Sequence, residues 1–177
     1  MSEDLDRDLA EARAAAAAEQ RRELRRTRQI LEAEATFAAL LAALCQRGAD
    51  VVIDTVAGCH HVCRIERVSS DVAIVSMGSG ATGVIRHEAM VAVRATDGSV
   101  ELVADEVAAL PMITLAEVLV ELSDRRATAT IRAGAGLLVG QIRSVGTDVL
   151  TLLPPSGGEA VYVRLDSVSE VTFSAGS

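Results

Sequence analysis

The densest group of residues that could do chemistry is Cys-His-His-Val-Cys at positions 59–63. On a strand, Cys59, His61 and Cys63 project from one face, because side chains alternate between the two faces. Thiolates and imidazoles bind Zn²⁺, and His87 or another chain could supply a fourth ligand. One strand cannot close a tetrahedron alone, however, and cysteine is also a common small core residue. We therefore predict no metal and no other cofactor, and keep Cys59, His61 and Cys63 as the candidate ligands.

A second group of charged residues is an arginine-rich stretch between positions 21 and 28. If the stretch is helical, its basic side chains can contact the phosphates of a nucleic acid. The alternative is a solvated helix surface, on which glutamates at helical spacing balance the arginines. Both interpretations stay open. The arginines concerned are Arg21, Arg22, Arg25, Arg26 and Arg28.

No part of the sequence predicts an enzyme. Asp71 and Asp148 each follow a short polar pair and are typical of turn residues that bond to their own backbone. The glycine-rich segment 78–83 does not lie between a strand and a helix, which is the context that a phosphate-binding loop needs. The three histidines have no convincing nucleophile partner, so we name no catalytic residue.

Composition and charge limit the class of protein. The chain has 177 residues and a net charge of −8, and all 17 basic residues are arginine. The acidic balance disfavours a broad polyanion-binding surface but does not exclude a local one. An odd number of cysteines, an acidic N-terminal segment and the lack of a long apolar run indicate a cytoplasmic protein that does not enter a membrane.

An internal repeat organises the chain, because residues 37–94 and 115–173 are two versions of one unit. We place one extra residue in the first unit, between Gly58 and Ile65. Residues that both units share are expected to serve the fold, whereas residues found in one unit are candidates for function. Each unit opens with four apolar residues at the same helical spacing, namely Phe37, Leu40, Leu41 and Leu44 in the first and Leu115, Val118, Leu119 and Leu122 in the second.

Local patterns predict the elements that must position these residues. Residues 3–45 contain no Gly or Pro and predict a long helix. A second helix is predicted over 115–124, where Thr114 and Glu117 form a capping box. Short alternating segments predict five strands in each unit, which is typical of a small barrel. The predicted strands are 51–55, 61–68, 72–76, 83–86 and 90–94, then 127–132, 137–145, 149–153, 160–165 and 168–173.

Both units carry a matching set of apolar, glycine, aspartate and arginine positions. In the first unit these are Leu40, Leu41, Leu44, Val51, Ile53, Gly58, Ile65, Asp71, Ile85, Arg86, His87, Ala89 and Met90, and in the second Leu119, Leu122, Ile131, Gly136, Gly140, Gln141, Ile142, Asp148, Val163, Arg164 and Leu165. The pattern resembles that of Sm-like domains, closest to the bacterial Hfq branch. The resemblance covers both units and leaves the N-terminal arm outside.

The resemblance implies a fold and a function. The implied fold class is mainly β with helices: a long N-terminal helix followed by two tandem helix-plus-five-stranded antiparallel Sm-like (SH3-like) barrels. The implied function is RNA binding, with Arg86, His87 and Arg164 contacting bases or phosphates. Such domains assemble into rings by pairing edge strands, so a homo-oligomer is expected, in which three chains could make a six-unit ring. A single merged sheet would remove the basis for the nucleic-acid inference.

The expected domains are a helical arm (1–35), a first barrel with its helix (36–103), a linker (104–113) and a second barrel with its helix (114–174). The leading function is a non-enzymatic RNA-binding protein, acting as a post-transcriptional regulator or RNA chaperone. One alternative is a protein-interaction or oligomerisation module without nucleic-acid binding, with protein partners held by the N-terminal helix. Another is a DNA-binding transcriptional regulator that uses the arginine-rich helix.

Overall fold

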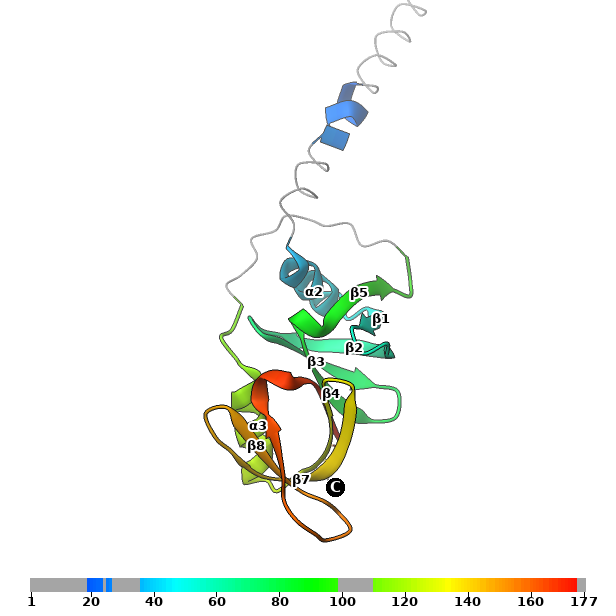
Figure 1. Ribbon diagram of the computed structural model, residues 1–177. Coiled ribbons are helices and arrows are strands. Elements are labelled where there is room, and N and C mark those ends of the chain that lie inside the picture. Colours follow the sequence, from blue (N-terminus) through cyan, green and yellow to red (C-terminus); the bar gives the residue numbers. More distant parts are fainter. Residues whose placement is uncertain (1–18, 24, 27–35, 99–109, 175–177) are drawn as a thin grey trace, which may run out of the picture. The chain divides into compact units, whose positions relative to one another are not determined.

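The structure, a computed structural model, describes residues 19–23, 25–26, 36–98 and 110–174. Residues 37–98 and 110–174 belong to one compact unit, which is built on a ten-stranded sheet (Figure 1). The described residues before Thr36 belong to a separate unit. In the described ranges, no helix is both long and apolar enough to cross a membrane.

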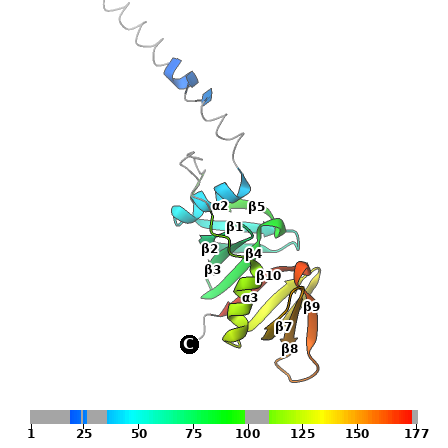
Figure 2. The same ribbon diagram turned by 90° about the vertical axis from the view of Figure 1, so that its left-hand side faces the viewer.

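Two α-helices lie in the described part of the sheet unit, α2 (Phe37–Gln46) and α3 (Leu115–Asp124). The capping box predicted for α3 is confirmed, because the Glu117 N–H donates to Thr114 Oγ1 and the Glu117 carboxylate accepts from the Thr114 N–H. Helix α2 packs against β2 and helix α3 against β7 (Figure 2).

The strands fall into two halves with the same internal order. The first half holds β1 (Asp50–Thr55), β2 (His60–Val68), β3 (Val72–Met77), β4 (Ala81–Arg86) and β5 (Met90–Ala95), and the second holds β6 (Thr128–Ala133), β7 (Gly136–Val145), β8 (Val149–Leu153), β9 (Val161–Arg164) and β10 (Val168–Ser174). All ten lie where the alternating pattern predicted a strand. The 3-10 turns η1 (His87–Ala89) and η2 (Leu165–Ser167) precede β5 and β10. The sheet order is β5-β1-β2-β3-β4-β10-β6-β7-β8-β9.

The strand register confirms the repeat and locates its extra residue. Asp54 pairs with His60, whereas its counterpart Arg132 pairs with Leu137, which is one position nearer along the chain. The extra residue of the first unit therefore lies in the turn before His60. Residues at equivalent register positions in the two halves are counterparts of one another.

The prediction of two tandem five-stranded barrels is wrong, because both halves belong to one antiparallel sheet. Strand β4 pairs with β10 from Ile85 opposite Glu170 to Ala81 opposite Ser174. Each half alone would leave these two strands as open edges, with unpaired N–H and C=O groups, and the pairing removes both edges. The merged sheet also removes the fold-based support for nucleic-acid binding.

Strands β3 and β4 contribute to two cores at once. Val72 and Val84 pack in the core of the second half, whereas Ala73, Val75 and Ile85 pack in the core of the first half. Alternate residues of a strand point to opposite faces, so a strand covered on both faces is apolar throughout. Because the two cores share these strands, the halves are not separate barrels.

The prediction of one long N-terminal helix is also wrong. Thr36 is not helical, and α2 begins at Phe37. Threonine favours the position before a helix over the helix interior, because its hydroxyl competes for backbone hydrogen bonds. Residues 19–23 and 25–26 are helical, and the rest of the predicted helix lies outside the described residues. The domain boundaries stay predictions, since residues 99–109 also lie outside.

Replacing Ile53 or Ile131 by valine should shift one shared unfolding transition. The two isoleucines are fully buried counterparts, one in each core, and the loss of one buried methylene group costs about 0.5–1.5 kcal/mol. Because β3 and β4 serve both cores, we expect a single urea transition by circular dichroism, which either variant moves to lower urea. Two transitions, each moved by one variant alone, would mean that the halves unfold independently.

Candidate functional site

A polar cluster forms where side chains from the start of β2 and from β10 come into contact. His61 Nε2 donates to Glu170 Oε2 at 3.0 Å, and Cys59 Sγ lies within 4.8 Å of a ring nitrogen of His61 and of a carboxylate oxygen of Glu170. Arg132 on β6 donates from Nε to Glu170 Oε2 over 3.4 Å. We call Cys59, His61, Arg132 and Glu170 the junction cluster, because they come from both halves of the sheet.

The strand register turns these side chains toward one another. Residues that lie directly opposite each other on paired strands point to the same face. His61 lies opposite Ile53, and Glu170 lies opposite Ile85 on β4 and Arg132 on β6. Ile53 and Ile85 are both buried in the first core. His61 and Glu170 therefore share the face of the sheet that carries this core.

The turn between β1 and β2 places Cys59 and Thr55 beside them. Gly58 has φ +75°, a conformation that glycine adopts without strain, and the Thr55 N–H donates to the Cys59 carbonyl oxygen at 3.0 Å. Thr55 Oγ1 and Glu170 Oε1 are buried and have no hydrogen-bond partner among the described residues. A buried unpaired oxygen costs about 1–3 kcal/mol, although the Thr55 hydroxyl still lies near enough to Glu170 to stabilise its charged form.

Glu170 is a buried carboxylate that stays charged. The residue is 5% exposed, and this burial raises its pKa. The hydrogen bond from His61, the nearby hydroxyl of Thr55 and the charges of His61 and Arg132 together outweigh burial, so the pKa of Glu170 lies below its ordinary value. Glu170 is therefore ionised at neutral pH.

The structure separates Cys63 from the other two candidate ligands. Cys63 packs in the first core, where burial and, to a lesser extent, the charge of Asp50 raise the pKa of its thiol to about 11. Cys63 is thus a neutral, small core residue. Cys59 and His61 stay together, and their third partner is Glu170. Sequence reasoning missed Glu170 because it lies 109 residues from His61 in the chain.

A residue-by-residue comparison of the two repeats would have indicated that His61 and Glu170 are unusual. By strand register, the counterpart of His61 is Leu138 and the counterpart of Glu170 is Ala92. The fold accepts apolar side chains at both positions. A half-buried histidine and a buried glutamate in only one of the two repeats are therefore not required by the architecture.

Arg86 and His87, predicted to contact nucleic acid, make contacts within the protein. The Arg86 side chain is 16% exposed and donates to Glu88 Oε1 at 3.0 Å and to the Leu165 carbonyl oxygen at 3.3 Å. Burial lowers the pKa of His87 in spite of the opposing charge of Asp71, so its imidazole is neutral at pH 7. Arg86 links η1 to η2 across the two halves.

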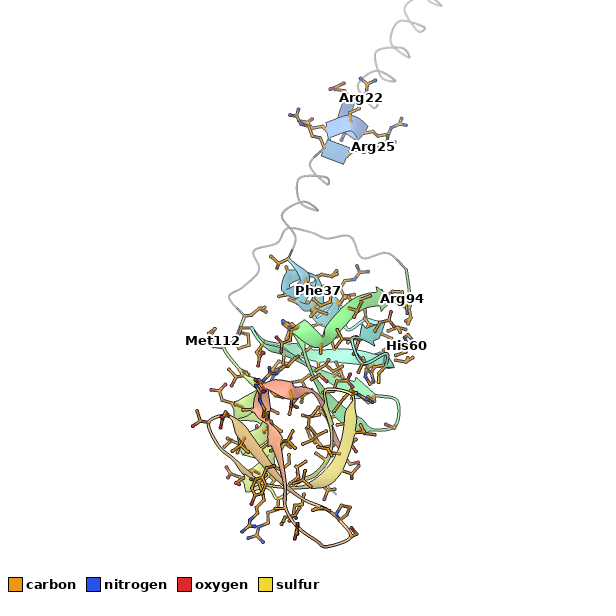
Figure 3. All side chains as sticks on the ribbon, viewed as in Figure 1. Arg22, Arg25, Phe37, His60, Arg94 and Met112 are labelled. Carbon is orange, nitrogen blue, oxygen red and sulfur yellow. The ribbon has the colours of Figure 1, made fainter. Side chains whose placement is uncertain are left out.

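The other predicted contact residues that the structure describes lie at the surface. The Arg164 side chain is 80% exposed and pairs with Asp166. Figure 3 shows Arg22 and Arg25 projecting from their helical segment, and Arg22 pairs with Glu19 at 3.5 Å. Arg28 lies outside the described residues. The exposed arginines of the described arm are Arg21, Arg22, Arg25 and Arg26.

No protein-family model matches this chain, and no curated protein matches it in sequence. The Sm-like resemblance therefore stays a prediction. What the site can do follows from its geometry alone.

Replacing Arg86 by alanine should destabilise the fold more than replacing its counterpart Arg164. The Arg86 variant loses a part-buried hydrogen bond to the Leu165 carbonyl oxygen, which keeps the Val168 N–H as a second donor, so the loss should cost about 0.5–1.5 kcal/mol. The exposed Arg164 should cost less than about 0.5 kcal/mol. Urea denaturation of both variants measures the difference, and equal losses would show that Arg86 makes no structural link between the halves.

Proposed function

We propose that this protein is a non-enzymatic self-association module, whose copies join head to tail through the two ends of the sheet. The observation behind this proposal is the β4–β10 pairing, by which the two halves of one chain are already joined. The end strands β5 and β9 are the counterparts of β10 and β4. A second copy could therefore repeat, between chains, the junction that exists within one.

The β9 end exposes residues whose counterparts are covered. Tyr162 corresponds by register to Val84. Val84 is 0% exposed in the second core, whereas Tyr162 is 73% exposed. Arg164 corresponds to Arg86 and is likewise exposed where Arg86 is largely buried. The β9 end thus presents an uncovered version of the surface that β4 buries against β10.

The β5 end shows the complementary difference. Phe37 in α2 is 37% exposed, whereas its counterpart Leu115 in α3 is 0% exposed. Figure 3 shows Phe37 at the start of its helix. Val93 on β5 is only partly buried, whereas its counterpart Val171 on β10 is fully buried. In the second half, β3 and β4 cover this apolar surface; at the β5 end, no described strand does.

The backbone of the end strands β5 and β9 also favours pairing between copies. An end strand presents unpaired N–H and C=O groups along its outer edge, and another strand can pair with them. Among the described strands, β5 and β9 hold these positions. Because β9 of one copy would meet β5 of the next, the interface is heterologous and gives a ring where the rotation closes. Three chains in a ring of six halves is one such assembly.

We also propose a cytoplasmic location. All three cysteines are free thiols, as expected of a protein in a reducing compartment.

Replacing Tyr162 by glutamate should abolish self-association. The new carboxylate would be buried without a partner at the β9–β5 junction, which costs several kcal/mol. By sedimentation velocity we expect wild-type assemblies larger than the 18.5 kDa chain and association at least roughly 100-fold weaker for the variant.

The matched control for this variant is Val62→Glu. Val62 is 66% exposed, close to the 73% of Tyr162, but lies on β2 and not on either end strand of the sheet, so assembly should be unchanged. A wild-type chain that stays monomeric at high concentration, or a Tyr162→Glu chain that assembles normally, would exclude the proposed junction.

RNA binding is the second candidate, and its support is the exposed, helical arginines Arg22, Arg25 and Arg26. Exposed arginines on a helical segment can contact the phosphates of a nucleic acid. Several exposed arginines of the sheet unit pair with acidic side chains, as Arg22 does with Glu19: Arg64 with Asp50, Arg94 with Asp54 and Arg125 with Glu121.

If the arm binds nucleic acid, replacing Arg22, Arg25 and Arg26 together by alanine should weaken binding and flatten its salt dependence. Each lost phosphate contact lowers the slope of log K against log salt by about 0.7 for a single strand. Fluorescence anisotropy titrations with single-stranded RNA, single-stranded DNA and duplex DNA distinguish RNA binding from DNA binding. Arg125→Ala is the control, and the absence of binding to all three at low salt would remove this candidate.

A further inference from the structure

The junction cluster brings three different metal-binding groups to one point. A thiol, an imidazole and a carboxylate, from Cys59, His61 and Glu170, have their ligand atoms within 4.8 Å of one another. We propose that these three residues form a binding site for a divalent transition metal, with Zn²⁺ as the preferred ion. All three ligands come from one chain, so this inference does not depend on self-association.

The spacing of the ligand atoms fits a tetrahedral ion. Bonds of about 2.0–2.2 Å to nitrogen and oxygen and 2.3 Å to sulfur put the ligands of Zn²⁺ about 3.4–3.6 Å apart. In the structure, His61 Nε2 and Glu170 Oε2 are 3.0 Å apart, and one ligand atom from each of Cys59, His61 and Glu170 lies within 4.8 Å of the other two. Closing the site therefore needs side-chain shifts of no more than about 1.5 Å. Rotation about the side-chain bonds of Cys59 and His61 can supply such shifts.

The donor set selects the type of ion. Thiolate and imidazole ligands favour Zn²⁺ over Mg²⁺ and Ca²⁺, which prefer oxygen ligands throughout. Two anionic ligands, the Cys59 thiolate and the Glu170 carboxylate, would neutralise a divalent ion. Binding releases the Cys59 thiol proton to solvent and frees His61 Nε2 to bind the ion, so that the bound ring carries its proton on Nδ1. With three protein ligands, a fourth position stays open to water.

An unsatisfied oxygen points to a missing partner. Glu170 is about nineteen-twentieths buried, and its Oε1 has no hydrogen-bond partner among the described residues. Buried carboxylate oxygens are otherwise paired or bound to metal. A cation bound by Glu170 would pair this oxygen.

Arg132 fits the role of an outer partner of the site. It contacts Glu170 Oε2 over 3.4 Å and can hold the carboxylate in place while the metal binds its other side. Groups that orient a metal ligand in this way commonly change affinity 10- to 100-fold. Without a metal, the same residues form a buried ion-pair network of His61, Glu170 and Arg132, which is the competing explanation for the cluster.

The test is metal binding by the full chain after treatment with a chelator. Titration with Zn²⁺ should saturate at one ion per chain and raise Tm, because the ion links β2 of the first half to β10 of the second. Co²⁺ should give a thiolate-to-metal absorption band. Cys59→Ser, His61→Leu and Glu170→Gln should each weaken Zn²⁺ binding at least roughly 100-fold, since losing a ligand costs at least as much as losing an outer partner.

Matched variants separate this site from adventitious binding. His60→Ala changes an exposed neighbour, Cys45→Ser and Cys63→Ser change the other thiols, and all three should bind Zn²⁺ as the wild type does. His61→Leu places in the first repeat the residue that the second repeat has at Leu138, and circular dichroism checks its fold. If Glu170→Gln does not fold, Cys59→Ser, at a partly exposed position, decides. Absence of stoichiometric binding, or binding that survives Cys59→Ser, would leave only the ion-pair network.

Discussion

The hydrogen-bonded pairing of β4 with β10 is the interaction on which the rest of the structure depends. It joins residues 81–85 to residues 170–174 and so makes one sheet from two repeats. The same pairing brings Val84 into the second core and Ile85 into the first. It also fixes Glu170 opposite Ile85, on the face where His61 lies. Core packing, junction cluster and the identity of the two end strands all follow from this one ladder.

Local signals predicted the elements well and their assembly poorly. Alternating apolar residues located all ten strands, and the Thr114–Glu117 pair located the start of α3, because both depend on residues close in sequence. The pairing of one strand edge with another depends on residues that are far apart in the sequence, so no local pattern predicts the β4–β10 pairing. A partial signal existed in Val72-Ala73-Ile74-Val75, an unbroken apolar run that is typical of a strand covered on both faces.

The candidate site shows the same limit at the level of single residues. Arg86 and Arg164 are identical side chains at equivalent positions, yet one is enclosed and the other exposed, because only β4 has a neighbouring strand. Their two-residue spacing put Cys59, His61 and Cys63 on one face of a predicted strand. It could not show that Cys63 packs in the first core while Cys59 and His61 lie beside Glu170. The sequence did contain a difference between the repeats. The counterparts of His61 and Glu170 are Leu138 and Ala92, so the fold itself needs only apolar residues at these two positions.

The duplication also has a consequence for how the chain reaches its native state. A β10 edge can pair with the β4 edge of its own chain or with that of a neighbour, since the hydrogen bonds and the apolar contacts are the same in both cases. Tethering within one polypeptide gives the internal partner an effective concentration on the order of millimolar, so correct pairing wins in dilute solution. At high protein concentration during refolding, the halves of different molecules compete for the same edges, and exchange of halves between chains becomes the characteristic misassembly of this architecture.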